Sequence, residues 1–109
     1  MSNANERQHY RIQYPVAARP HITIEGRSFE VIDLSEGGLR FRTEDTPSFA
    51  MADEVSGRVR FRRTEAVHVK GAVVRLGGRE VALKLDVAIP LRVIIEEQRY
   101  LREQHRGKA

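Results

Sequence analysis

Residues 21–43 read HITIEGRSFEVIDLSEGGLRFRT and determine the expected architecture of the whole chain. Apolar and polar side chains alternate along three short runs, a period of two that indicates β-strands with one buried face. These runs span residues 21–25, 29–33 and 39–43. Gly26-Arg27 and Gly37-Gly38 interrupt the alternation, and such glycine-containing breaks predict hairpin turns. We therefore expect an antiparallel meander in which the second strand turns its apolar residues, and at its end Asp33, toward the core.

The same period of two continues downstream through three more runs. They span residues 55–62, 67–74 and 81–85. Gly71 interrupts the second of these runs and predicts a bulge or a bend, and Gly77-Gly78 predicts another hairpin turn. Open edges of an antiparallel sheet invite aggregation, and closure of the sheet removes them. The expected fold is therefore all-β, a six-stranded antiparallel β-barrel.

The hydrophobic period changes near the C-terminus. Pro90 suits the first turn of a helix, and Gly107 is a typical residue at a helix end. We expect a C-terminal α-helix over about 90–104 whose apolar stripe packs on one mouth or outer face of the barrel. This stripe consists of Leu91, Ile94, Ile95 and Leu101.

The composition is that of one small domain. The chain has 109 residues, of which 40% are hydrophobic and 31% are charged, enough for a single core. We expect a flexible arm over residues 1–6 and one folded domain over 7–106. No apolar run approaches the ~20 residues that cross a bilayer, and the N-terminus lacks the apolar core of a signal peptide. The absence of cysteine excludes disulfides and fits a reducing compartment, so we expect a cytoplasmic protein without membrane insertion.

Positive charge in this chain is carried mostly by arginine. The formal net charge is +4, and only Lys70, Lys84 and Lys108 among 19 basic residues are lysines. Arg7 and Arg11 enclose His9 in an R-x-x-x-R spacing. Two converging guanidinium groups can bind phosphate bidentately or stack on a purine. A solvated basic arm is the plainer interpretation of this motif when it is taken alone.

A second motif, Asp33-Leu34-Ser35-Glu36-Gly37-Gly38, has a D-x-S-x-x-G spacing within a strand–turn–strand pattern. An ionised Asp accepts hydrogen bonds from the N–H groups of a guanine edge, and the Ser35 hydroxyl can donate to a phosphate or a base. The two glycines allow positive φ and close approach to the backbone. An ordinary turn, in which Asp and Ser bond to the local backbone, is the alternative.

The chain resembles the PilZ domain family over roughly residues 5–105. The resemblance is carried by an arginine arm, one hairpin, D-x-S-x-x-G on the next strand, and a barrel with a C-terminal helix. Ligand-binding members of the family are receptors for the bacterial second messenger cyclic di-GMP. The resemblance implies that a loop over residues 7–11 folds over the ligand, with Arg7 and Arg11 contacting guanine and phosphate. It implies that Asp33, Ser35 and Gly38 read a guanine edge from the barrel surface. Secondary candidates are Gly37, His9 and Arg40.

The resemblance also implies a receptor that catalyses nothing. Ligand binding would order the N-terminal arm and change the contact with an effector protein that the sequence does not identify. Outputs in the family include motility, exopolysaccharide synthesis and biofilm attachment. Glu6 stands where some members carry a further arginine that is linked to a stacked ligand pair, and its charge favours one ligand per domain. Arg40, Arg75 or Arg79 could still recruit a second molecule.

Metal and catalytic sites find little support in the sequence. The histidines are scattered without metal-ligand spacing, so we expect no metal. Asp33 and Ser35 have no evident histidine base, so we expect neither nucleophilic catalysis nor a cofactor.

Two other functions stay open as alternatives. The first is a small basic barrel that binds single-stranded nucleic acid through a strip on one strand. This strip contains Arg58, Arg60, Arg62 and Arg63. Stacking platforms need exposed aromatic rings, whereas Phe29, Phe41 and Phe61 fall on the expected inward face, which argues against a nucleic-acid polymer. The second is an adaptor that binds protein only.

Overall fold

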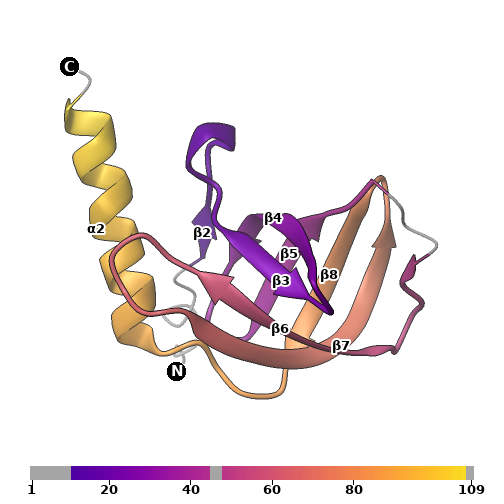
Figure 1. Ribbon diagram of the computed structural model, residues 1–109. Helices are drawn as coiled ribbons and strands as arrows, with labels where there is room; N and C mark the ends of the chain where they lie inside the picture. Colours follow the sequence, from indigo (N-terminus) through magenta and orange to yellow (C-terminus); the bar gives the residue numbers. More distant parts are fainter. Residues whose placement is uncertain (1–10, 45–47, 108–109) are drawn as a thin grey trace, which may run out of the picture.

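Six antiparallel strands close into a β-barrel in the computed structural model of the protein, which describes residues 11–44 and 48–107 (Figure 1). The strands are β3 (His21–Ile24), β4 (Arg27–Leu34), β5 (Gly38–Arg42), β6 (Glu54–Arg60), β7 (Val67–Gly77) and β8 (Glu80–Leu85). Their order is β4-β3-β6-β7-β8-β5, and β5 pairs again with β4 to complete the barrel. A short strand, β2 (Ile12–Gln13), adds to β4. The predicted six-stranded antiparallel barrel is confirmed.

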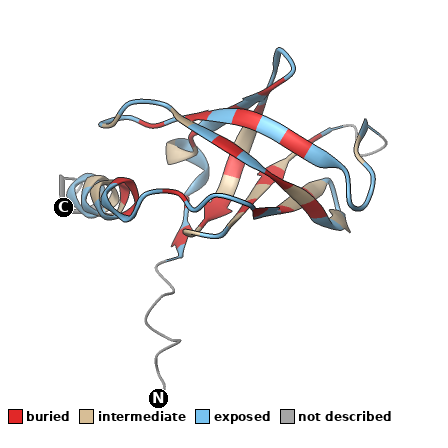
Figure 2. Ribbon diagram, turned by 90° about the horizontal axis from the view of Figure 1, so that it is seen from below, coloured by how far each residue is buried: buried red, intermediate tan, exposed pale blue. Residues whose placement is uncertain are grey.

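The core lies inside the barrel and follows the predicted alternation. Buried and exposed residues alternate along the strands, as Figure 2 shows. Phe29, Phe41 and Phe61 are buried as expected. The rings of Phe29 and Phe41 lie 5.1 Å apart between centroids, so aromatic packing adds to the burial of aliphatic side chains from every strand.

Two hairpin turns lie one residue away from their predicted positions. The β3–β4 turn is Glu25-Gly26, with φ values of 48° and 79°, and the β7–β8 turn is Gly78-Arg79, with 61° and 64°. Two-residue hairpins favour turns with positive φ at both central residues, because this geometry matches the strand twist. In each turn one of these positions is a glycine and the other is a larger residue. The positions of the glycines alone therefore did not predict which two residues form the turn.

A β-bulge at Ile32 changes the expected direction of Asp33. Val31 pairs with Phe41 and Asp33 pairs with Arg40, which leaves Ile32 as an extra residue on β4. The bulge resets the alternation, so Leu34, rather than Asp33, continues the apolar core. The core-facing direction that alternation alone gave Asp33 was wrong, whereas the resemblance had placed it at the barrel surface. Its carboxylate meets the side chain of Arg40, which alternates with the buried residues of β5.

Gly71 has a different role from the predicted bulge. The bulge of β7 falls at Val74, between the pairs Val73–Leu83 and Arg75–Ala82. Gly71 is buried at a close approach to β8, because a Cβ atom there would lie 2.2 Å from the carbonyl oxygen of Lys84. A glycine is therefore required by packing at this crossing.

The C-terminal helix α2 (Leu91–Gly107) follows Pro90 and lies at one end of the barrel (Figure 1). Its existence was predicted, and of the predicted stripe Ile94 and, in part, Leu101 pack on the barrel, whereas Leu91 and Ile95 do not. Leu91 and Ile95 are 41% and 40% exposed. The side chains that face the barrel are Val93, Ile94, Glu97 and, in part, Leu101. A short 3-10 turn (Val16–Ala18) joins β2 to β3.

Candidate functional site

A hollow of about 260 Å³ on the outside of the barrel brings together several of the predicted site residues. Four elements, β4, β5, β7 and β8, and the residue preceding β2 contribute to it. Its lining is Arg11, Asp33, Gly38, Leu39, Arg40, Val74, Arg75, Ala82 and Leu83. Arg11, Asp33, Gly38 and Arg40 were candidates from the sequence, and they come from two separate motifs. Arg7, His9 and Glu6 lie outside the described residues.

The Asp33 carboxylate is the centre of this hollow. It is 1% exposed and accepts hydrogen bonds on both oxygens. Arg11 Nη1 donates to Oδ1 at 3.3 Å, and Arg40 donates to Oδ2 through Nε at 2.9 Å and Nη2 at 2.5 Å. Burial of a carboxylate is costly unless charged donors compensate for the lost water. The hydrogen bond to Asp33 in turn raises the pKa of Arg40.

Strand pairing explains why these side chains meet. Asp33 lies opposite Gln13 of β2 on one side and opposite Arg40 of β5 on the other. Arg11 immediately precedes β2, so the pairing of β2 with β4 brings the second arginine of the R-x-x-x-R motif to the aspartate of the D-x-S-x-x-G motif. The bulge at Ile32 then presents the Asp33 side chain on the outer side of the barrel.

Arg40 is held between two acidic side chains. Its Nη1 donates to Glu80 Oε1 at 2.9 Å, while Nε and Nη2 donate to Asp33. Glu80 begins β8 and is half-buried. The three residues form a chain of charge-assisted hydrogen bonds in which Arg40 stays fixed even if one of its partners moves. Sequence reasoning missed Glu80, because only the register of β5 against β8 reveals its place.

The turn after β4 is anchored on both sides. The Ser35 N–H donates to the Gly38 carbonyl, and the carbonyls of Gly37 and Glu36 accept from Leu85 and Ile89, all at 2.9 Å. The expectation that Gly37 and Gly38 supply positive φ was wrong, since neither has it. A Cβ atom on Gly37 would meet nothing within 4 Å. These glycines therefore leave the surface of the turn open, with Ser35 half-buried beside Gly38.

Apart from Arg75, which the sequence offered for a second ligand, the floor of the hollow comes from residues that the sequence did not single out as site residues. Val74 is 49% exposed and belongs to the bulge of β7, and Ala82 and Leu83 belong to β8. Arg75, next to the bulge, adds a third guanidinium to the lining. A shift of register places Val74 and Arg75 at this surface, and simple alternation along β7 does not predict it.

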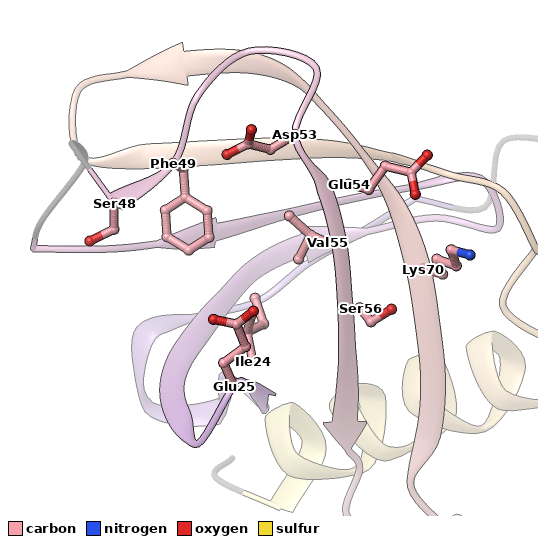
Figure 3. Close-up of a pocket in the computed structure, with 9 residues that line it drawn as sticks. All are labelled: Ile24, Glu25, Ser48, Phe49, Asp53, Glu54, Val55, Ser56 and Lys70. Carbon is pink, nitrogen blue, oxygen red and sulfur yellow. The ribbon is translucent and has the colours of Figure 1, made fainter.

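A larger hollow, of about 440 Å³, has the opposite charge. It lies by the β5–β6 connection, at the end of the barrel remote from α2 (Figures 1 and 3). Its charged residues are Glu25, Asp53, Glu54 and Lys70, and Phe49 lies among them against the aromatic core. Three carboxylates against one ammonium disfavour an anionic ligand. The smaller hollow with three arginines is the better candidate for such a ligand.

Residues 11–44 and 48–107 contain neither a cluster of metal-ligating side chains nor a membrane-spanning helix. Within these ranges no three histidine or acidic side chains gather as a metal ion would need. No helix in the same part of the chain is long and apolar enough to cross a membrane.

The chain also matches a known protein family. The family model of the PilZ domain matches residues 5–103, nearly the whole chain. No curated protein matches the sequence.

Proposed function

Because the chain belongs to the PilZ domain family, a family of cyclic di-GMP receptor domains, we propose that it binds cyclic di-GMP in the hollow around Asp33. The observation that carries the proposal is the meeting of Arg11 and Asp33, one from each motif, at a buried carboxylate. This hollow contains three arginines and one acceptor, which suits a ligand that carries both phosphates and guanine bases.

The contact between Arg11 and Asp33 suggests how a guanine would bind. A guanidinium group offers adjacent N–H donors, and the N1–H and N2–H₂ edge of guanine offers a similar pair. The hydrogen bond from Arg11 to Asp33 is longer than those from Arg40, and the Arg11 side chain is the more exposed of the two. We therefore expect the guanine edge to replace Arg11 at Asp33 Oδ1, while Arg40 keeps Oδ2 and remains tied to Glu80.

The displaced Arg11 would then be free to bind the ligand directly. Together with Arg7 it would contact a phosphate or stack on a base. Arg75 lines the same hollow and can add a third positive charge. The turn surface at Gly37 offers room for the ligand beside Ser35, because nothing lies within 4 Å of the space that a side chain there would fill.

In this proposal the protein is a receptor without catalytic activity. Binding would order the arm that carries Arg7, and the ordered arm would change the contact with an effector protein in motility, exopolysaccharide or biofilm control.

Calorimetric titration with cyclic di-GMP tests the proposal. Wild-type protein should bind, and Arg7→Ala, Arg11→Ala and Asp33→Asn should each weaken binding about tenfold or more, as expected for hydrogen bonds to charged groups. Arg92→Ala, at an exposed arginine of α2, is the matched control and should bind like wild type. No heat with wild type would refute the function. Unchanged affinity in all three site variants would refute the site, and the stoichiometry would report whether one or two ligands bind.

A further inference from the structure

The outer surface of β3, β6 and β7 gathers basic side chains that are not part of the hollow around Asp33. We call it the basic face and define it by His21, Arg58, Arg60, His68 and Lys70. All five are exposed. The strand register sets them side by side, because His21 pairs with Arg60 and Arg58 pairs with His68.

These side chains have no acidic partner within hydrogen-bond or ion-pair distance in the described part of the chain. Several arginines elsewhere do, as Arg19 pairs with Glu30, Arg63 with Glu96 and Arg92 with Glu65. Within residues 11–44 and 48–107, none of the five residues of the basic face makes a side-chain hydrogen bond or an ion pair. The charges of Arg58 and Arg60 are therefore not paired within the described part of the chain, whereas Lys70 borders the larger, acidic hollow.

Fold stability does not explain this arrangement. Arg58 and Arg60 project from the same face of β6, about 7 Å apart, and their like charges repel. Charged residues often protect an open sheet edge from aggregation, but β6 is paired on both sides, with β3 and with β7. No edge is present there to protect. An anionic partner would relieve the repulsion.

We propose that the basic face binds an acidic segment of a partner protein. Neighbouring strands lie ~4.8 Å apart, and same-face residues along a strand lie ~7 Å apart, so the face presents a close array of donors to several carboxylates. Arginine forks match carboxylate geometry. Single-stranded nucleic acid would need aromatic stacking platforms, whereas the described aromatic residues beneath this face, Phe29 and Phe61, are buried, and Tyr100 packs against Arg62 and Arg63.

The basic face is connected to the candidate ligand site through one strand. The first half of β7 carries His68 and Lys70, and its second half carries Val74 and Arg75 in the hollow. A partner on the basic face and a ligand in the hollow would therefore contact the same strand. The proposal itself does not depend on cyclic di-GMP binding.

Fluorescence anisotropy with a labelled oligoglutamate peptide tests the proposal at low ionic strength, where surface charges act most strongly. The test variant is Arg58→Glu/Arg60→Glu. The matched control is Arg99→Glu/Arg102→Glu, which changes the net charge equally on exposed positions of α2. We expect about tenfold weaker peptide binding for the test variant and less than about twofold for the control. Thermal melts should show that both variants remain folded.

Three results would overturn the proposal. The first is an absence of peptide binding by the wild-type protein. The second is an equal loss of binding in both variants, which would indicate an effect of net charge alone. The third is tighter binding of an oligothymidylate of the same formal charge, lost in the same variant, which would assign the face to nucleic acid instead.

Discussion

The Tyr14 hydroxyl donates a 2.7 Å hydrogen bond to Oε1 of Glu97, linking residues 83 positions apart in the sequence. Both side chains are buried. Burial and the neighbouring carboxylate raise the pKa of Tyr14, so the hydroxyl keeps its proton and donates. The Tyr14 N–H also donates to the Ile32 carbonyl, at the bulge beside Asp33. The segment that follows Arg11 is therefore fastened to α2 on one side and to the site strand on the other.

The first prediction concerns the loss of this hydrogen bond. Tyr14→Phe leaves the buried Glu97 carboxylate without its hydroxyl donor, and Glu97 Oε2 already has no hydrogen-bond partner among the described residues. Unfolding in urea should show a loss of about 1–3 kcal/mol. Tyr100→Phe is the control, because the Tyr100 ring packs against arginines and should keep that contact without its hydroxyl. Equal stability of the two variants would contradict the role of the bond.

The second prediction is a pH dependence that arises from Glu97. Burial raises the pKa of Glu97 above its ordinary value and outweighs the opposing effects of Tyr14 and the nearby arginines. The folded state therefore binds the proton more tightly than the unfolded state does. The contribution of Glu97 to the free energy of unfolding is greatest below its ordinary pKa, about 4.5, and falls as pH rises through the higher folded value. Glu97→Gln should gain stability relative to wild type over that range.

Urea unfolding of both proteins at a series of pH values measures this difference. Glu65→Gln serves as the control of opposite sign, because a hydrogen bond from Arg92 lowers the pKa of Glu65. Relative to that variant, wild type should gain stability as pH rises through the lowered folded value toward the ordinary one. A pH-independent difference between wild type and Glu97→Gln would refute the assignment of a raised pKa to this residue.

Local patterns were sufficient to predict the strands but not their irregularities. The barrel could be predicted because apolar residues occupy alternate positions in every run, and that pattern depends only on the strand itself. The bulges at Ile32 and Val74 depend on how many residues the partner strand places opposite. One extra residue turned Asp33 away from the core, and no property of residues 29–33 alone reveals it.

Long-range contacts also decided the helix face and the site. Helical spacing predicted a stripe with Leu91 and Ile95, whereas the barrel contacts α2 along Val93 and Glu97. A glutamate such as Glu97 would be assigned to the surface from sequence alone, because only the fold brings Tyr14 beside it. The two signature motifs were predicted to meet, but Glu80 and Val74 enter the site only through strand register, which single-strand periodicity does not contain.

The third prediction compares two glycines. Gly71→Ala should destabilise the protein by about 2 kcal/mol or more, because its Cβ would lie 2.2 Å from the Lys84 carbonyl oxygen and the neighbouring β8 backbone would have to move. Gly37→Ala should be neutral or slightly stabilising, since its Cβ meets nothing within 4 Å and its φ is not positive. Thermal unfolding of the two variants provides the comparison. A stability loss at Gly37 equal to that at Gly71 would contradict the packing argument.

The fourth prediction tests the electrostatics of the proposed cyclic di-GMP site. Glu80 adds a negative charge beside the hollow, next to Arg40, and this charge repels an anionic ligand. Glu80→Gln removes the charge but keeps the Oε1 acceptor for Arg40 Nη1. Because both side chains are partly exposed, screening limits the effect to about twofold to threefold tighter binding at low salt. Glu54→Gln removes the same charge from the larger, acidic hollow and should leave the calorimetric affinity for cyclic di-GMP unchanged. Weaker binding by Glu80→Gln would mean instead that the ionised Glu80 holds Arg40 in the orientation that the ligand requires, so that orientation outweighs repulsion.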